Sequence, residues 1–194
     1  MGMRTATLER KTRETDIVGK LTLDGSREIQ VTTGIGFLDH MVTALAFHAG
    51  WDLQLRCEGD LEIDDHHSAE DCAIVLGKLL EESVGDRSGI KRFGSAYAPL
   101  DEALARCVVD VSGRPFASVE LGFRREMIGQ LATENMTHFW QTLATNAGVT
   151  LHLDLIRGDN DHHKAEAGAK AAALAFRDAL AATDDDVAST KGVL

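Results

Sequence analysis

Two short segments of the chain carry the residue types that bind metal ions in proteins. Both read Asp-His-His-x-x-Glu, and they start at Asp65 and at Asp161. Each continues into a proline-free run rich in Ala and Leu, so we expect each segment to begin a helix. Residues four apart share one face of a helix, so the first histidine and the glutamate can reach the same metal ion. These candidate ligands are His66 with Glu70 and His162 with Glu166.

The second histidine of each segment, His67 or His163, is turned by about 100° from the first on a helix, so it must serve another site. A further histidine stands at a similar distance before each segment, His40 before the first and His138 before the second. The repeated pattern predicts two metal sites, each with three histidines, one glutamate and open positions for a substrate. The eight predicted ligands are His40, His66, His67, Glu70, His138, His162, His163 and Glu166.

Imidazole nitrogen combined with carboxylate oxygen suits Mn, Fe, Co, Ni or Zn, and the absence of thiolate from the motif argues against a structural cysteine site. A single segment of this kind is equally typical of an ordinary charged start of a helix. The second copy, with the same offsets between its histidines and glutamate, is what favours metal binding. The spacing leaves open whether the two halves meet within one chain or between subunits.

The composition is typical of a globular protein with a sizeable core. The chain has 194 residues, of which 44% are hydrophobic, and its net charge of −11 disfavours a nucleic-acid partner. No apolar run approaches the roughly 18 residues of a membrane span, and the first residues lack the apolar segment of a signal peptide. The three cysteines have no metal or redox spacing and are typical of buried residues in a reducing compartment. We therefore expect a cytoplasmic protein with neither a membrane nor a nucleic acid as partner.

The order of the predicted elements repeats along the chain. Alternating hydrophobicity predicts strands, and helical periodicity predicts helices. In the first half we expect strands at 5–10, 16–23, 28–32 and 52–57, a hairpin turn at Asp24-Gly25, and helices at 37–48 and from the first motif to about residue 84. In the second half we expect strands at 102–110, 116–121 and 151–156, and helices at 134–147 and 162–182. This pattern predicts an α+β fold made by internal duplication of two small sheet-plus-two-helix halves, residues 1–90 and 91–194.

Several other polar residues give weaker signals when each is taken singly. Glu14 is typical of an exposed strand carboxylate, and the basic residues are typical of solvated surface charges. The segment from Ser189 to the end is typical of a disordered tail. The basic residues concerned are Arg92, Arg114, Lys170 and Lys191.

Taken together, the motifs resemble one known family over nearly the whole chain. They are Arg13-Glu14-Thr15, Gly36-Phe37-Leu38-Asp39-His40-Met41, both Asp-His-His-x-x-Glu segments, Arg92-Phe93-Gly94, Asp101-Glu102, Ser112-Gly113-Arg114-Pro115 and Ser189-Thr190-Lys191-Gly192. The sequence is similar to that of imidazoleglycerol-phosphate dehydratases of histidine biosynthesis. It departs from the family pattern at Ala188, where a proline often precedes the Ser-Thr-Lys run.

The resemblance implies a duplicated fold of the ribosomal-protein-S5-domain-2-like type, two Mn(II) ions per active site, and a homo-oligomer of 24 subunits with metal sites at subunit contacts. It implies that Glu14 is an acid/base group and that His40, Glu70 and Glu166 also take part in catalysis. It further implies a set of residues that bind the phosphate of a small phosphorylated imidazole substrate. That set is Arg92, Arg114, Lys170, Ser189 and Lys191.

The implied reaction removes water from D-erythro-imidazole-glycerol phosphate and gives imidazole-acetol phosphate. The C–H bond that breaks is not next to a carbonyl group, so it is not acidic. Metal ions on the ring nitrogens would lower the N–H pKa and favour an imidazolate, which can expel the adjacent hydroxyl group. A base, for which Glu14 is the candidate, then removes the side-chain proton. The basic residues hold the phosphate and so orient the substrate.

Two alternatives from other classes fit the His and Glu ligands alone. One is a metallohydrolase that uses a metal-bound hydroxide, and it would release phosphate where a dehydratase would not. The other is a metal-binding assembly protein without enzymatic activity, whose behaviour would not depend on Glu14 or on the basic residues.

Overall fold

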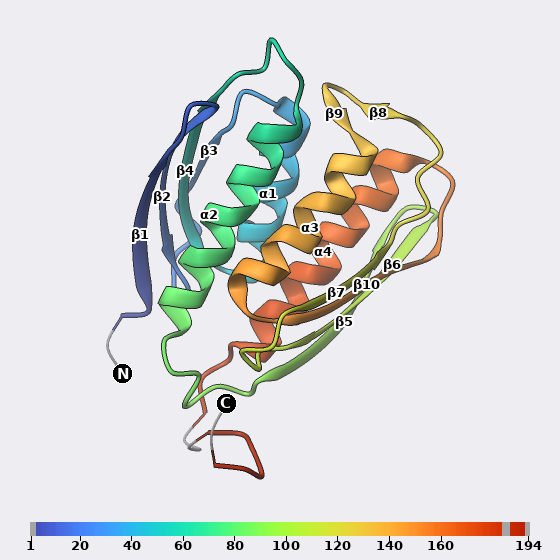
Figure 1. Cartoon of the computed structure of the whole chain (residues 1–194). Helices are drawn as coiled ribbons and strands as arrows, with labels where there is room; N and C mark the ends of the chain where they lie inside the picture. Colours follow the sequence, from blue (N-terminus) through green and yellow to red (C-terminus); the bar gives the residue numbers. More distant parts are fainter. Residues whose placement is uncertain (1–2, 184–186, 193–194) are drawn as a thin grey trace.

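The computed structural model describes residues 3–183 and 187–192, and within them two four-stranded sheets enclose four helices. Figure 1 shows the three layers: the first sheet on one side, the helices in the middle and the second sheet on the other side. Helices α1 and α2 cover the first sheet, and α3 and α4 cover the second. In the middle layer α2 contacts α3, and α1 contacts α4. The α+β class and the two similar halves predicted from the sequence are confirmed.

Both halves run through the same order of elements. The first consists of β1 (Thr5–Lys11), β2 (Thr15–Thr22), β3 (Ile29–Thr32), α1 (Gly36–Ala49), β4 (Asp52–Gly59) and α2 (His66–Val84). The second consists of β5 (Phe93–Leu100), β6 (Ala103–Asp110), β7 (Phe116–Glu120), α3 (Thr133–Ala147), β10 (Thr150–Arg157) and α4 (Asp161–Ala179). A small hairpin is inserted before α3, and its strands are β8 (Met127–Ile128) and β9 (Leu131–Ala132).

The strand order is also duplicated. The first sheet has the order β1-β2-β4-β3, and the second has the order β5-β6-β10-β7. In each sheet the last two strands in this order are parallel and the other pairs are antiparallel. Helices α1 and α3 even end in the same way, because Gly50 and Gly148 both adopt the left-handed conformation that caps a helix. The same topology in both halves means that the two metal motifs begin equivalent helices.

The predicted hairpin at Asp24-Gly25 is wrong. Strands β2 and β3 follow each other in the chain but do not pair, because β4 lies between them. Residues 23–28 therefore form a connection that crosses one strand of the sheet. The side chain of Asp52 anchors this connection by accepting hydrogen bonds from the backbone amides of Ser26 and Glu28.

One strand, β5, was not predicted from the sequence. Its small residues, Gly94 and Pro99 give a weak strand pattern, but β5 is an edge strand, where proline is tolerated. Gly94 is needed for packing, since a Cβ atom there would lie 2.0 Å from the carbonyl oxygen of Ala175 in α4. Small residues therefore let this edge strand lie directly against helix α4.

A single hydrophobic cluster runs through both halves of the described chain. Helices α2 and α3 pack closely at Gly77 of α2, where a Cβ atom would lie 2.7 Å from Cβ of Asn146 in α3. The cysteines Cys57, Cys72 and Cys107 are buried and free, as the sequence predicts. Because the halves share a core, the division into residues 1–90 and 91–194 stays a prediction. Within the described ranges, no helix has the length and apolar character needed to cross a membrane.

Candidate metal centres and anion pocket

The first of two His/Glu clusters lies between α1 and α4. His40 comes from α1, and His162 and Glu166 come from α4. The Nε2 atom of His40 lies 3.1 Å from Oε2 of Glu166, and the Nε2 atom of His162 lies 3.3 Å from the same oxygen. The side chain of Asn160 caps the start of α4 by accepting hydrogen bonds from the first backbone amides of the helix. This cap fixes the helical turn that carries His162.

The second cluster lies between α2 and α3 and repeats this arrangement. It contains His66 and Glu70 from α2 and His138 from α3. Nε2 of His138 is 3.0 Å from Oε1 of Glu70, and Nε2 of His66 is 3.8 Å from Oε2 of Glu70. The rings of His66 and His138 are stacked, with centroids 5.2 Å apart. Each cluster therefore combines a His/Glu pair from one half with a histidine from the other half.

The donor set of each cluster fits a divalent transition metal. Two imidazole nitrogens and one carboxylate oxygen lie within 4.8 Å of one another in both clusters. These are ligands that Mn, Fe, Co, Ni and Zn accept. The histidines are only partly buried, so other ligands can approach from solvent. Six of the eight ligands predicted from the sequence are thus brought together in two open sites.

Lys170 lies beside the first cluster. Its Nζ atom is 2.7 Å from Oε1 of Glu166, one helical turn away. Burial raises the pKa of Glu166, but the hydrogen bonds from Lys170 and His40 outweigh burial and hold this pKa at about 2. Glu166 is therefore ionised at neutral pH, as a metal ligand must be.

The other two predicted ligands, His67 and His163, lie outside both clusters in the described part of the chain. Each is held by a carboxylate: Nδ1 of His67 is 3.0 Å from Asp60, and Nδ1 of His163 is 2.7 Å from Glu102. These hydrogen bonds raise the pKa of both histidines. A carboxylate on one ring nitrogen is the usual way to orient a histidine that binds metal through the other.

Glu14 lies at the same end of the molecule as His67. Its Oε1 atom is 3.7 Å from Nε2 of His67, and its backbone oxygen accepts a hydrogen bond from the amide of Asp60. The neighbouring Thr15 donates its hydroxyl to Asp71, which is buried on α2. The turn that carries Glu14 is therefore fixed to the helix that carries the first metal motif.

Four of the five predicted phosphate-binding residues line one pocket of about 600 Å³. They are Arg92, Arg114, Ser189 and Lys191. The fifth, Lys170, lies at the first metal cluster instead. Among the residues that the structure describes, the pocket lining contains no carboxylate, but the side chain of Asp110 contacts both arginines. Sequence reasoning missed Asp110, because its contact with Arg92 depends on the unpredicted strand β5.

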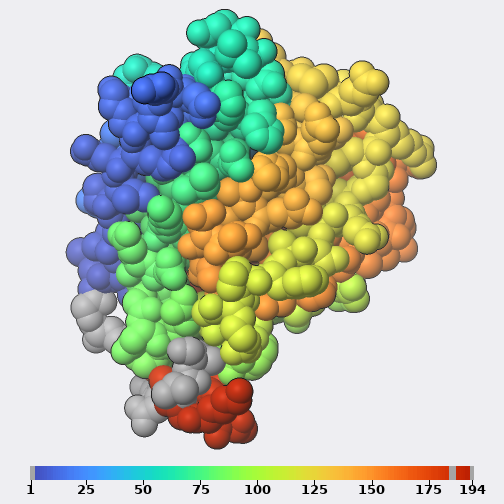
Figure 2. Space-filling view, in the orientation of Figure 1, coloured from blue at the N-terminus to red at the C-terminus, as the bar shows by residue number. Residues whose placement is uncertain are grey.

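We call the pocket lined by Arg92, Arg114, Ser189 and Lys191 the anion pocket, and the end of the molecule that carries the two His/Glu clusters the metal end. The two lie at opposite ends of β5. Arg92 precedes this eight-residue strand, and Asp101, which is 3.9 Å from His163, follows it. An eight-residue strand spans about 25 Å. Figure 2 shows the same separation: the tail, in red, is at the bottom, and the loop before α2, in turquoise, is at the top. Within one chain, no small substrate could reach both places.

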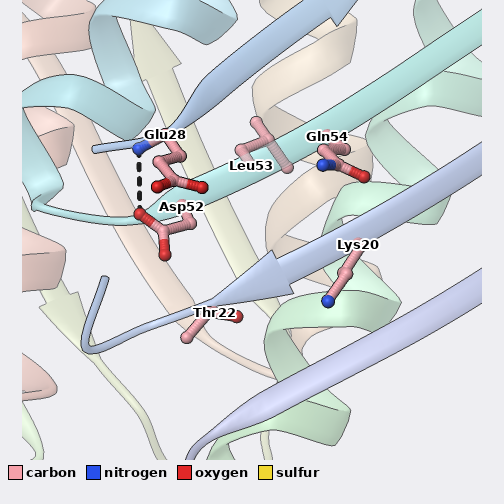
Figure 3. A pocket seen from close by; sticks show the side chains of 6 residues that line it. All are labelled: Lys20, Thr22, Glu28, Asp52, Leu53 and Gln54. Carbon is pink, nitrogen blue, oxygen red and sulfur yellow. Dashed lines mark hydrogen bonds between the residues drawn. The ribbon is translucent and has the colours of Figure 1, made fainter. Parts of the chain in front are cut away.

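A smaller pocket on the first sheet is lined by Lys20, Thr22, Glu28, Asp52, Leu53 and Gln54 (Figure 3). One carboxylate oxygen of Asp52 accepts a hydrogen bond from the backbone amide of Glu28, 2.9 Å away. That hydrogen bond and those from Ser26 and Arg27 lower the pKa of Asp52. This pocket therefore belongs to the anchor of the connection between β2 and β3.

Comparison with known proteins gives a consistent result. The sequence profile of imidazoleglycerol-phosphate dehydratase matches residues 33–176. An imidazoleglycerol-phosphate dehydratase of Candida glabrata is 53% identical, with 97% of this chain and 99% of the relative covered. One of Salinibacter ruber is 52% identical, with 98% and 96% covered.

Solved structures agree with the sequences. The crystal structure of imidazoleglycerol-phosphate dehydratase from Staphylococcus aureus matches with a TM-score of 0.81 and 40% identity, covering 92% of this chain and 99% of the other. The crystal structure of IGPD from Pyrococcus furiosus in complex with (S)-C348 matches with a TM-score of 0.84 and 35% identity, covering 96% and 100%. Full-length similarity in sequence and in fold places this chain in the imidazoleglycerol-phosphate dehydratase family.

Proposed function

We propose that the chain removes water from imidazole-glycerol phosphate in histidine biosynthesis, using two Mn(II) ions per active site and residues from more than one subunit. The dehydratase class follows from family membership, since the named relatives are dehydratases over almost their whole length. The family is metal-dependent, and the two His/Glu clusters are the groups that could hold the metal. What the proposal adds is the role of each residue.

The proposed metal ligands are the two clusters together with His67 and His163. His40, His162 and Glu166 would hold one ion, and His66, Glu70 and His138 would hold the other. His67 and His163 are oriented by Asp60 and Glu102, and each would complete a cluster on a neighbouring subunit. Metal ions bound there would act as Lewis acids that lower the N–H pKa of the substrate's imidazole ring.

Glu14 is the proposed acid/base group. Its carboxylate lies 3.7 Å from Nε2 of His67, so a substrate held beside this histidine would be within reach of it. Its backbone is fixed through Asp60 and through the pair of Thr15 and Asp71. A carboxylate held in this way can take the proton from the substrate's side-chain carbon after the hydroxyl group has left, because loss of that group makes the C–H bond acidic, and can then return a proton to carbon as the enol becomes the ketone.

The anion pocket is proposed to bind the substrate's phosphate. Arg92, Arg114, Ser189 and Lys191 supply guanidinium, hydroxyl and ammonium donors from the pocket, and Lys170 supplies a further cation from the metal end. The phosphate group is not part of the bonds that break, so binding it serves to orient the substrate. A phosphate fixed in this way holds the carbon to be deprotonated at a constant position relative to Glu14.

The anion pocket and the metal end of one chain are about 25 Å apart along β5, and this separation is the reason to propose an oligomer. A complete active site needs the metal end of one subunit and the anion pocket of another, because one chain holds them at opposite ends. We propose a closed homo-oligomer of 24 subunits, with its metal sites at subunit contacts and located in the cytoplasm. Metal binding would then also contribute to the free energy of assembly.

The observation that carries this proposal is the pair of equivalent His/Glu clusters, each built from both halves of the chain. The test is a dehydration assay on purified protein, with elemental analysis before and after chelation. We expect turnover without phosphate release, loss of turnover when metal is removed, and recovery with Mn(II). Release of inorganic phosphate would favour a metallohydrolase, and metal binding without turnover would favour an assembly protein.

A further inference from the structure

Asp110 lies at the end of β6, next to the anion pocket. Its Oδ1 atom accepts a hydrogen bond of 2.7 Å from Nε of Arg92, and its Oδ2 atom accepts one of 3.2 Å from Nη2. The same Oδ2 atom lies 3.7 Å from Nη2 of Arg114. One carboxylate thus contacts both arginines of the pocket.

Arg92 also holds the tail. Its Nη1 atom donates a 2.6 Å hydrogen bond to the backbone oxygen of Ala188, the residue before Ser189. Its guanidinium group lies 4.6 Å above the ring of Phe93. A guanidinium has five N–H donors, so the bonds to Asp110 and Ala188 leave donors that can still face a ligand. Arg92 therefore connects the strand, the tail and the pocket.

The backbone of Arg92 is fixed as firmly as its side chain. Its φ of 71° is in the left-handed region, which is costly for a residue other than glycine and persists where the surroundings hold it. Its amide donates to the carbonyl of Ala179 at 2.9 Å, and its carbonyl accepts from the amide of Val111 at 3.0 Å. With the backbone fixed, the direction of the guanidinium group depends on the carboxylate of Asp110.

We propose that Asp110 is a positioning residue for phosphate binding. It orients Arg92 so that one guanidinium group faces the pocket and also holds Ala188, which keeps Ser189 and Lys191 over the same pocket. This inference rests on the proposed function, because it assigns Asp110 to the site that takes the phosphate of the substrate. The ligand class is a phosphate monoester dianion.

Charge and positioning predict opposite effects for the change Asp110→Asn. A carboxylate repels an anion, so removing its charge should tighten phosphate binding if electrostatics alone decides the affinity. If Asp110 acts by orienting Arg92, its removal should weaken binding even though the pocket becomes more positive. The sign of the change in phosphate affinity therefore separates the two explanations.

The test measures KM and kcat for imidazole-glycerol phosphate and the dissociation constant for inorganic phosphate in Asp110→Asn. We expect KM and the phosphate dissociation constant to rise about tenfold, as when a charged hydrogen bond is lost, with kcat changed less than about twofold. The matched control is Asp154→Asn, because Asp154 pairs with Arg106 on the same sheet at 2.7 Å but does not line the pocket. The control should leave both constants unchanged.

Two further variants test the same inference independently. Arg92→Lys keeps the charge but cannot hold Asp110 and Ala188 together, so it should reproduce the rise in KM even if Asp110→Asn fails to fold. In a chain that ends at Ala188, Asp110→Asn should have a smaller effect than in the full chain, because the tail is already gone. An equally large effect in both chains would contradict the link to the tail.

Unchanged or tighter phosphate binding in a folded Asp110→Asn would overturn the inference. So would a fall in kcat and melting temperature without a change in KM, because that would show a purely structural role. Binding of inorganic phosphate does not require turnover. A wild-type protein that binds phosphate but does not dehydrate the substrate would refute the proposed function and not this inference.

Discussion

The carboxylate of Glu14 is fixed through its backbone and its neighbours, while half of its side chain remains exposed. This arrangement suits a group that must meet a substrate and transfer a proton. At the other end of the molecule, the side chain of Arg92 is 12% exposed and is held by its hydrogen bonds to Asp110 and Ala188. The groups proposed to touch the substrate thus stay accessible, and contacts with neighbouring residues fix their positions.

Replacing Glu14 by Gln should abolish chemistry and retain binding. The change keeps the size of the side chain and removes only its capacity for proton transfer, so we expect kcat to fall by about 10²–10⁴-fold with KM nearly constant. Steady-state kinetics checks this, with Glu9→Gln on the preceding strand as the control. A Glu14→Gln protein that keeps its normal kcat would show that another group transfers the proton.

At the scale of the elements, the start of α4 is held by a buried ion pair. Lys164 and Asp161 are 2.7 Å apart with side chains that are 1% exposed, and Lys164 also donates to the carbonyl of Gly122. Asp161 accepts the backbone amides of Arg124 and Arg125. This network fixes the loop after β7 to the helix turn that carries the second metal motif.

Lys164→Met should therefore destabilise the protein, because it leaves the carboxylate of Asp161 buried without its partner. Loss of one member of a buried pair costs about 3–5 kcal/mol. For a chain of this size, that corresponds to a fall in melting temperature of about 10 °C. Calorimetry on metal-free protein checks this, and Lys91→Met, in an exposed pair with Asp178, should change the melting temperature little.

The effect of Lys164→Met should also depend on pH. Burial raises the pKa of Asp161, but Lys164 and the backbone amides of Arg125 and Arg124 lower it to below its ordinary value. A lowered folded-state pKa gives stability above the pKa of an unfolded aspartate, about pH 4, and this stability is lost as the pH falls further. The difference between wild type and variant should shrink below about pH 4, and a difference that grows there would contradict this account.

Gly77 sets the spacing between α2 and α3, the two helices that carry the ligands of the second metal cluster. A Cβ atom there would lie 2.7 Å from Cβ of Asn146 and 2.8 Å from the carbonyl oxygen of Leu143, so α2 could not stay this close to α3. We expect Gly77→Ala to lower the melting temperature by a few degrees, because overpacking outweighs the better helix propensity of alanine. Gly36→Ala, where nothing lies within 4 Å, is the control. A Gly77→Ala protein as stable as wild type would show that the helices can separate freely.

Much of this arrangement could be predicted from the sequence, and the exceptions have physical causes. The metal motifs are local, because a histidine and a glutamate four residues apart must share a helix face. The grouping of His40 with His162 and of His138 with His66 could not be predicted, because it depends on which helices contact each other. Asp110 was missed because β5 has too many small residues to be predicted as a strand.

At the scale of the whole molecule, the anion pocket and the metal end are separated by the length of β5. This predicts complementation between subunits. Metal-free Glu14→Gln and Arg114→Ala proteins, mixed in equal amounts and reassembled with Mn(II), should recover about a quarter of the wild-type rate at low substrate concentration, because about a quarter of random pairs combine two intact parts. Each variant reassembled alone is the control. No recovery in a verified mixed assembly would place both parts in the same subunit.

The two-half construction of the clusters has a consequence for ancestry. Each cluster needs a His/Glu pair from one half and a histidine from the other, and the halves share one topology. A half-length chain with one copy of each motif would therefore assemble both clusters by pairing with an identical chain. Fusion of two such genes would keep both sites while freeing the copies to diverge. Such divergence is visible where Ser68 in one motif corresponds to the buried Lys164 in the other.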